Sequence, residues 1–200
     1  MSQERLDAGP HVHSLIADRW SMRAFADRDV EAEKVRACLE AARWAPSCYN
    51  EQPWYFIVGR RGEGEAHARL FDCLVEQNQR WAGEAPVLMI SVAKPTFDSG
   101  GRTNRHAQHD VGLATMNLML QAQALGLAAH AMAGFKRKET RETFGVPEDH
   151  EPMAAIAIGY PGEADALPED LAEKERAPRQ RRPLSAWVFG ETWGEMAPFV

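Results

Sequence analysis

Apolar residues recur at three- to four-residue spacing in several stretches of the chain, the pattern that predicts amphipathic helices. The clearest stripe consists of Val35, Leu39, Ala42 and Ala45. Asp29 precedes this stripe and is a candidate N-cap, while Glu31 and Glu33 complement the positive end of the helix. Pro46 follows the stripe and cannot continue a helix. We therefore expect a helix that starts after Asp29 and ends before Pro46.

Three other runs are continuously apolar and rich in β-branched or aromatic residues, which predicts buried strands. They are Trp54–Val58, Pro86–Ala93 and Met153–Tyr160. Helical spacing appears around and between them, at residues 11–20, 63–79 and 138–144, with a long helix from near Asn104. Strands that are apolar throughout and alternate with helices predict a sheet covered on both faces.

From Val111 to Phe135 the chain carries no formally charged residue. A membrane span needs about 20 predominantly apolar residues. Polar residues interrupt this run too often for that, at Thr115, Asn117, Gln121, Gln123 and His130. The pattern instead predicts a helix buried on most sides, followed by a strand. Few places in a chain of this size can bury a helix so fully, so we expect a dimer interface to provide the second cover.

The end of the chain has a different character. Residues 161–182 include eleven charged residues and three prolines, so this stretch cannot form a core of its own. An apolar tail with strand propensity follows, carrying Leu184, Trp187, Val188, Phe189 and Trp193. A polar arm that ends in an apolar strand predicts docking at a distance, and exchange of such arms between protomers makes a tight symmetric dimer.

Composition excludes several classes of protein. The chain has 200 residues, of which 44% are hydrophobic and 26% charged, as in soluble globular proteins. A net charge of -6 argues against nucleic-acid binding, which requires a basic surface. The three cysteines form no CxxC pair, which predicts a reducing compartment. The first residues lack the apolar run of a signal peptide, so we expect a cytoplasmic protein without membrane partners.

Within this acidic chain, basic residues gather at two places. Arg176, Arg179, Arg181 and Arg182 fall within seven positions, and Arg19 and Arg23 flank Ser21 near the other end. Guanidinium groups fit phosphate oxygens in bidentate fashion, and a serine hydroxyl adds a neutral donor. The alternative is solvated surface charge. The two clusters together predict a phosphate site.

Seven short motifs carry a family resemblance. They read Arg19-Trp20-Ser21-Met22-Arg23-Ala24-Phe25, Ala42-Arg43-Trp44-Ala45-Pro46-Ser47, Asn50-Glu51-Gln52-Pro53-Trp54, Asp110-Val111-Gly112-Leu113-Ala114, Ala133-Gly134-Phe135, Ala157-Ile158-Gly159-Tyr160 and Arg179-Gln180-Arg181-Arg182-Pro183-Leu184. With these motifs the chain resembles the nitroreductase family of FMN-dependent oxidoreductases. Each motif alone is weak, but the ordered set spans nearly the whole chain.

The resemblance implies a fold and an assembly. The fold is an α+β sandwich of the nitroreductase type, with a central mixed β-sheet flanked by helices. The assembly is an intertwined homodimer with exchanged C-terminal arms. In this arrangement residues 1–160 form the FMN-binding core, and residues 161–200 form an extended arm that completes the same domain or the partner subunit.

The resemblance also implies an FMN site built from distant parts of the chain. Arg19 and Ser21, with Arg179 and Arg181, would hold the phosphate, and Arg23 would lie near the pyrimidine end of the isoalloxazine. The amide of Asn50 would pair with the flavin's O2 and N3–H edge. The full predicted set is Arg19, Trp20, Ser21, Met22, Arg23, Pro46, Ser47, Asn50, Gln52, Ala133, Gly134, Arg179 and Arg181.

The implied activity is transfer of electrons from NAD(P)H to a nitroaromatic, a quinone or a similar small-molecule acceptor, by a ping-pong mechanism. FMN performs the chemistry in such enzymes, so we expect no catalytic side chain and no metal. Gly134, preceded by Ala133, would let a backbone N–H approach flavin N5. Alternatives on the same fold are reductive dehalogenation, flavin fragmentation, and a non-catalytic protein that sequesters FMN.

Two positions depart from the family pattern. Ala133 stands where some relatives carry a glutamate, and Trp20 stands where many carry a second basic residue or histidine. Other candidate sites are weaker. The glycines at 59, 62 and 64 lack the complete dinucleotide fingerprint. His106 and His109 have the spacing of metal ligands, but histidines at a helix start more often pair with neighbours or solvent. Cys48 is better explained as a packing or lining residue than as a nucleophile.

Overall fold

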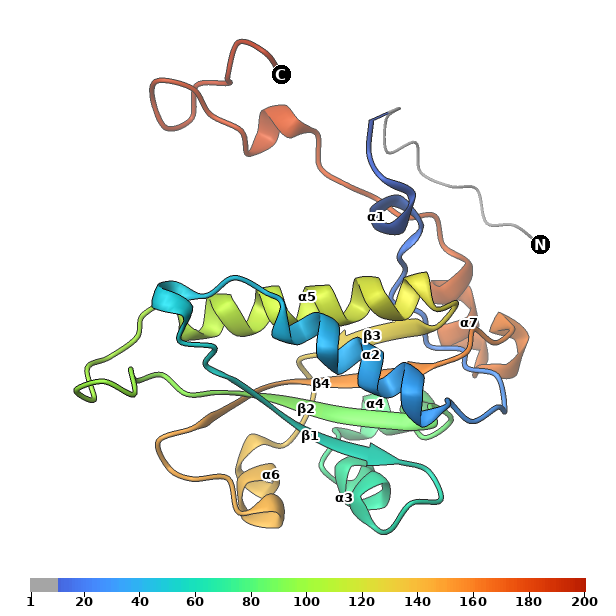
Figure 1. The fold of residues 1–200 in the computed structure, drawn as a ribbon. Helices are drawn as coiled ribbons and strands as arrows, with labels where there is room; N and C mark the ends of the chain where they lie inside the picture. Colours follow the sequence, from blue (N-terminus) through green and yellow to red (C-terminus); the bar gives the residue numbers. More distant parts are fainter. Residues whose placement is uncertain (1–10) are drawn as a thin grey trace.

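The structure is a computed structural model that describes residues 11–200, and its centre is one four-stranded sheet (Figure 1). The strands lie in the order β1-β2-β4-β3. Their bounds are β1 Trp54–Arg60, β2 Val87–Ala93, β3 Ala128–Met132 and β4 Glu151–Gly159. The predicted strands are confirmed, with β3 as the strand expected after the uncharged helix. The predicted α+β sandwich is also confirmed.

The predicted mixed pairing does not occur among residues 11–200. All three neighbouring pairs run antiparallel, with Ile57 opposite Ile90 and Ile90 opposite Ala155. A mixed sheet needs at least one crossover that returns the chain parallel to its neighbour. In this chain β4 enters between β2 and β3 and runs opposite to both, so no parallel pair forms.

Helices cover both faces of the sheet, which explains the continuously apolar strands. Every residue of β2 is buried. Val87 and Met89 belong to the core under α2 (Ala32–Arg43) and α5 (Ala107–Ala124), whereas Leu88 and Ile90 belong to the core on the opposite face. That face is covered by α3 (Ala66–Asp72), α4 (Glu76–Ala82) and α6 (Arg137–Phe144).

Two local predictions within the body of the molecule were wrong. The helix expected at residues 63–79 is broken into α3 and α4, because the backbone at 73–75 bonds to residues 134–136 instead of continuing the helix. The Lys136 N–H donates to the Cys73 carbonyl over 2.7 Å, and the Val75 N–H donates to the Gly134 carbonyl over 3.2 Å. Asp29 does not cap α2; Glu31 occupies the N-cap position, and Asp29 faces Arg61 at 3.5 Å.

The charged stretch after Pro161 contains a helix that composition did not predict. In α7 (Glu169–Arg176), Leu171 and Ala172 are buried, and Leu171 joins the same core as the strand residues of that face. The helix is held further by Arg80, which pairs with Asp170 at 2.6 Å. A charged stretch without a core of its own therefore folds because its few apolar side chains pack into the core of the body.

After α7 the chain leaves the body as an arm, residues 177–200 (Figure 1). Several of its large apolar side chains are exposed, with Trp193 at 90% and Phe199 at 85%. The strand predicted in this tail does not form; the arm has a 3-10 turn at Leu184–Ala186 and one isolated bridge between Phe189 and Met196. A strand needs a neighbour for its backbone groups, and the extended arm has no sheet edge beside it.

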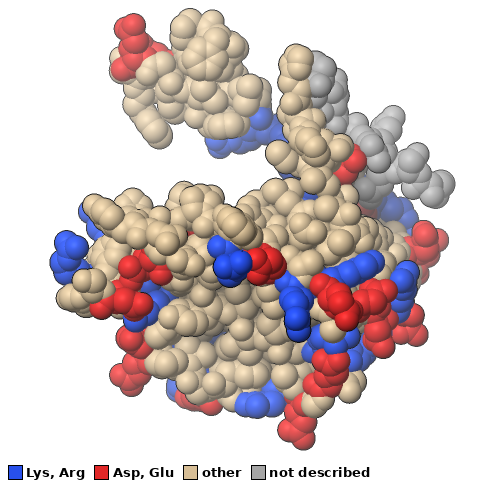
Figure 2. All heavy atoms as spheres, viewed as in Figure 1, with Lys and Arg blue, Asp and Glu red and all other residues tan. Residues whose placement is uncertain are grey.

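Part of the outer face of α5 is also bare. Leu118 and Ala114 are fully buried against the sheet, but Gly112 and Met116 face outward and are exposed. Figure 2 shows that the surface above α5, below the arm, carries few charged side chains. The body thus presents a surface with few charges to the arm, and the arm carries exposed apolar side chains, including Trp193 and Phe199.

Gly59 lets α3 pack closely against β1, and this generates a prediction for stability. A Cβ atom at position 59 would lie 2.4 Å from the backbone nitrogen of His67, which cannot move without shifting the helix. We expect Gly59→Ala to lower the free energy of unfolding by about 1–3 kcal/mol in urea titrations. Gly190→Ala is the control, because its nearest contact would be 3.4 Å. Equal stability of the two variants would contradict this packing.

Candidate cofactor site

The predicted residues near the start of the chain lie on an extended segment, Arg19–Ala24, between α1 (Ser14–Asp18) and an isolated bridge from Phe25 to Pro161. Polar side chains from two distant elements hold its backbone. Glu175 of α7 accepts the Arg23 N–H over 2.7 Å, and the His130 ring of β3 lies 3.0 Å from the Met22 carbonyl. The segment is therefore tied to the sheet and to α7 by hydrogen bonds.

Both arginine clusters of the sequence meet here. Arg19, Trp20, Ser21, Arg23, Arg179 and Arg181 line a hollow of about 210 Å³, which we call the arginine hollow. Arg19 donates to the Ser21 hydroxyl over 3.2 Å, and Arg179 donates to the Arg19 carbonyl over 3.0 Å. The Arg179 guanidinium lies 5.1 Å from the centre of the Trp20 ring, so Trp20 supports a basic residue from the other end of the chain.

The arginine hollow is crowded with positive charge. Burial lowers the pKa of Arg19, and the neighbouring cations Arg181 and Arg179 lower it further. Among residues 11–200, no carboxylate forms an ion pair with Arg19, Arg179 or Arg181. Mutual repulsion of these guanidinium groups is relieved when an anion binds between them, so the hollow suits a phosphate.

A second, larger cavity adjoins the hollow, because Arg23 lines both. Its volume is about 370 Å³, and we call it the polar cavity. Other residues that line it are Gln77, Asn78, Trp81, His130, Ala133, Gly134 and Lys174. The cavity thus combines aromatic rings, amide groups and two cations. A flat, polar ring system with hydrogen-bonding edges is the kind of ligand that such a lining accommodates.

The loop at Ala133 and Gly134 is fixed by α4. The Asn78 amide donates to the Gly134 carbonyl over 2.9 Å. A Cβ atom at position 134 would lie 2.7 Å from that amide nitrogen, so a larger residue here would displace the Asn78 side chain from its hydrogen bond. Within residues 11–200 the Gly134 N–H donates to no acceptor, so this donor remains for a ligand at the edge of the cavity.

Four predicted residues lie elsewhere. Pro46, Ser47, Asn50 and Gln52 flank or form a short turn, η1 (Cys48–Asn50), which is attached to the first turn of α5 by a 3.0 Å hydrogen bond from the Cys48 N–H to Asp110. Figure 1 shows η1 at one end of α5 and the segment after α1 beside the other half. The helix has 18 residues, a length of about 27 Å.

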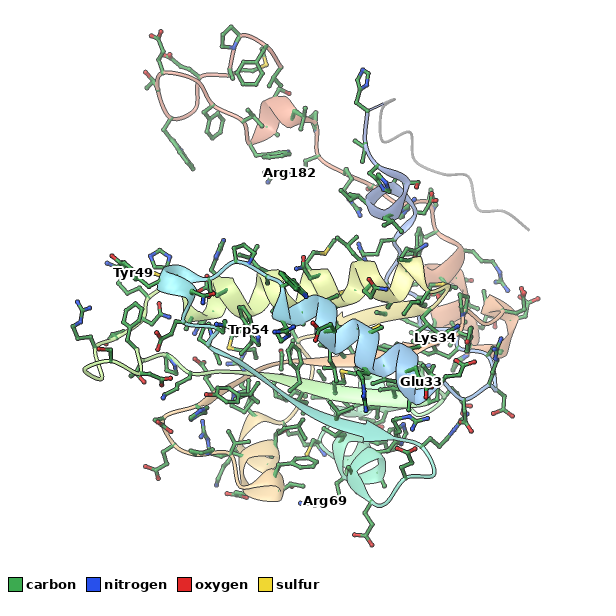
Figure 3. The ribbon with its side chains drawn as sticks, in the orientation of Figure 1. Glu33, Lys34, Tyr49, Trp54, Arg69 and Arg182 are labelled. Atoms are coloured by element: carbon green, nitrogen blue, oxygen red, sulfur yellow. The ribbon has the colours of Figure 1, made fainter. Side chains whose placement is uncertain are left out.

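The η1 turn has an unusual backbone. Tyr49, Asn50 and Gln52 all have φ between 52° and 58°, the left-handed region that non-glycine residues seldom adopt. The Gln52 N–H donates to the Ser47 hydroxyl over 3.0 Å, which helps to hold this conformation. Tyr49 is 88% exposed and points outward at the end of the molecule (Figure 3). Backbone strain of this kind persists only where the surrounding structure holds the loop, and it is often found at functional sites.

The structure therefore brings together one part of the predicted set and separates the other. Arg19, Trp20, Ser21, Arg23, Arg179 and Arg181 form the arginine hollow, and Ala133 and Gly134 line the polar cavity. Met22 contributes its carbonyl, while its side chain packs against the core. In a single chain, Asn50 cannot reach the cavity that Arg23 lines. Its assigned role toward a flavin requires a second copy and remains a prediction.

Sequence reasoning missed several residues of the polar cavity. Asn78, Trp81, His130 and Lys174 come from α4, β3 and α7, which are far apart in the sequence. A signal was present in α4, where Gln77 and Asn78 lie about one helical turn before Trp81, which is almost fully buried. Amides beside a buried aromatic in a short helix are candidates for ligand contacts, but only the fold shows what they face.

Residues singled out for other chemistry have ordinary partners. His109 lies 3.4 Å from Asp110, and Cys48 uses its backbone N–H rather than its thiol in the contact with that carboxylate. No group of three potential metal ligands gathers in the part of the chain that the structure describes. No helix within residues 11–200 has both the length and the hydropathy to cross a membrane.

His130 is the titratable group most strongly affected by the cavity. Burial lowers its pKa from about 6.5 to about 4; Arg23 and Arg19 lower it further, and the Met22 and Ser21 carbonyls act in the opposite direction. The ring also packs against Trp81, with 4.7 Å between centres. A neutral imidazole that donates to the Met22 carbonyl therefore stabilises the Arg19–Ala24 segment at neutral pH.

This environment predicts a dependence of stability on pH. The folded-state pKa of His130 lies below the unfolded-state value, so the unfolded chain binds the proton more readily. Its stabilising contribution is complete above about pH 6.5 and is lost as pH falls toward 4. Between pH 7 and 4.5 the wild type should lose roughly 2–3 kcal/mol more in unfolding free energy than His130→Asn, whose amide can replace the donor. Equal losses in urea titrations would refute this assignment.

Comparison with known proteins shows which family the chain resembles. The family model described as "Nitroreductase family" matches residues 16–80 and 74–160. An uncharacterized 15.4 kDa protein of Mycolicibacterium smegmatis is 36% identical over 146 residues, covering 70% of this chain and 97% of that protein. A Methanothermobacter thermautotrophicus protein, whose name proposes an NADH dehydrogenase/NAD(P)H nitroreductase, is 30% identical over 174 residues, covering 82% and 84%.

A solved structure of an oxidoreductase containing FMN superposes with a TM-score of 0.90 at 33% identity, over 98% of each chain. The resemblance first carried by seven short motifs therefore extends over the fold as a whole. The chain belongs to the nitroreductase family.

Proposed function

We propose that this protein binds FMN and transfers electrons from NAD(P)H to a nitroaromatic, a quinone or a similar acceptor. Membership of the nitroreductase family makes the chain an oxidoreductase. Support for the cofactor comes from the similar structure that contains FMN, and support for the donor comes from the name of the relative described above. The identity of the electron acceptor is proposed only as a class of small molecules.

The single observation that carries the proposal is the junction of the two hollows at Arg23. FMN has a phosphate at one end and a flat ring system with hydrogen-bonding edges at the other. The arginine hollow offers clustered guanidinium groups to the phosphate. The polar cavity offers Asn78 and the Gly134 N–H to the edges of the ring. The chemistry of the residues thus changes along the site as the chemistry of FMN does.

Bound FMN supplies the electron transfer, and the protein supplies position, charge and exclusion of water. Arg19, Arg179 and Arg181 fix the phosphate end. Arg23 places a positive charge beside the cavity, where it favours a ligand that becomes more negative. Because no dinucleotide fingerprint occurs in the chain, NAD(P)H has no separate site and shares one face with the acceptor. Two substrates that use one face in turn give ping-pong kinetics.

We further propose that the working form is a homodimer. The residues at 46–52 lie at one end of α5, and the segment after α1, which carries Arg19 and Arg23, lies beside its other half, so one chain would hold two halves of a site that do not meet. A twofold axis across the bare face of α5 pairs each half with the other half from the second copy. The exposed tail, with Trp193 and Phe199, then finds an apolar surface to cover.

The phosphate assignment is tested with a neighbouring pair of arginines. Arg181 lines the arginine hollow, whereas Arg182, the next residue, does not. A charge-assisted hydrogen bond contributes roughly 1.5–3 kcal/mol, so Arg181→Ala should weaken FMN binding by about ten- to hundredfold. Arg182→Ala removes the same charge and should change affinity much less. Figure 3 shows Arg182 on the arm.

Fluorescence titration of flavin-free protein with FMN measures both affinities. The absorption spectrum before and after anaerobic NADPH then shows whether the nicotinamide reduces the bound flavin. A wild-type protein that binds no FMN would refute the proposed function. Equal loss of affinity in both arginine variants would leave only a general effect of charge and would refute the assignment of Arg181.

The dimer is tested by removing the tail, Leu184–Val200. Each large apolar side chain contributes roughly 1.5–3 kcal/mol when fully buried, so loss of several should prevent stable association. We expect the truncated chain to sediment as a monomer, or to aggregate, and to retain little FMN, since the split site is then incomplete. A truncated chain that sediments as a dimer loaded with FMN would contradict arm exchange.

A further inference from the structure

Glu175 is a buried carboxylate directly behind Arg23. Its side chain is only 3% exposed. One oxygen accepts the backbone N–H groups of Arg23 and Ala24, over 2.7 and 3.3 Å, and the other lies 3.4 Å from the Arg23 guanidinium. A buried charge is tolerated when it is paired and hydrogen-bonded in this way. Glu175 therefore fixes both the backbone and the side chain of Arg23.

The charges around the site make Glu175 distinctive. Among residues 11–200, no aspartate or glutamate lines either the arginine hollow or the polar cavity, whereas four arginines line the hollow, and Arg23 and Lys174 line the cavity. Glu175 is thus a negative charge held against a cation of the cavity from the protein side. It reduces the positive field that Arg23 projects into the cavity, and its own burial keeps solvent from screening this effect.

We propose that Glu175 is a positioning residue that sets the reduction potential of the bound flavin by partly neutralising Arg23. This inference rests on the proposed function. Reduction makes the pyrimidine end of the flavin more negative, so an uncompensated Arg23 favours the reduced form. Glu175 opposes that preference and keeps the bound cofactor a stronger reductant, which suits an enzyme that passes electrons to an acceptor.

The substitution Glu175→Gln separates charge from geometry. The glutamine oxygen still accepts the Arg23 and Ala24 N–H groups, while the negative charge disappears. We expect the ratio of affinities for reduced and oxidised FMN to rise about tenfold. For a two-electron couple this places the midpoint potential of the bound flavin about 30 mV higher. The potential is read from absorption spectra during reduction alongside a reference dye, without an acceptor substrate.

Two further variants act as controls. Glu173→Gln makes the same change of charge on the exposed side of the same helix and should leave the potential unchanged. Glu175→Asp keeps the charge on a shorter side chain, so it should restore a potential close to that of the wild type even if FMN binds more weakly. A residue with a purely structural role would give equal potentials in all variants that bind FMN.

If Glu175→Gln does not fold, Arg23→Gln is compared with Arg23→Gln/Glu175→Gln. In the first variant Glu175 keeps its hydrogen bonds to the two backbone N–H groups. The electrostatic field of Glu175 adds to that of Arg23 and persists when Arg23 is replaced, so the second variant, which lacks the negative charge, should show the higher potential. Either comparison with equal potentials overturns the role of Glu175 while leaving the proposed function intact. Failure of the wild type to bind FMN overturns the proposed function and this inference with it.

Discussion

The arrangement of the whole molecule depends on the burial of α5, a helix that carries no formal charge after Asp110. Its inner face, with Ala114 and Leu118, packs on the sheet and fixes the strands beneath it. Its ends fix two other parts: Asp110 holds the η1 turn at the beginning, and the strand after the helix carries His130 to the Arg19–Ala24 segment. One apolar helix thus positions both halves of the predicted site and keeps them apart.

The arginine hollow is positively charged, although the chain as a whole is negatively charged. The protein has a net charge of -6, yet the arginine hollow collects guanidinium groups from both ends of the sequence. Burial and like charges lower the pKa of Arg19, which marks the hollow as a place where an anion is favoured. Trp20 belongs to this arrangement, since its ring supports Arg179 and so replaces a further cation with a stacking surface.

Periodicity was sufficient for the strands and most helices, because β2 and α5 are buried strongly enough for the apolar pattern to decide their conformation. It failed where long-range backbone hydrogen bonds compete with local propensity, as at 73–75, where residues 134–136 break a helical pattern. It failed again in the tail, whose strand propensity has no neighbouring edge. Local preference cannot report a partner that is distant in sequence.

The residues of the candidate site also divide into those that local sequence could predict and those that it could not. The arginines were predictable because clustered cations in an acidic chain are visible in the sequence, and the motifs supplied Gly134. Glu175 and His130 were not, since each acts on the Arg19–Ala24 segment across more than a hundred residues: the sequence separations of their hydrogen bonds are 152 and 108. Within a charged helix and an uncharged strand, neither residue has a local signal that separates it from its neighbours.

In the proposed dimer, the position of Arg179 and Arg181 would connect cofactor binding to assembly. Both lie between α7, which is anchored on the body, and the tail, whose apolar side chains are exposed. A segment held at one end keeps conformational freedom, and ordering it for a phosphate has an entropic cost. Docking of the tail on a second copy would fix the other end and lower that cost. By linkage, a bound phosphate then favours association to the same extent that association favours the phosphate.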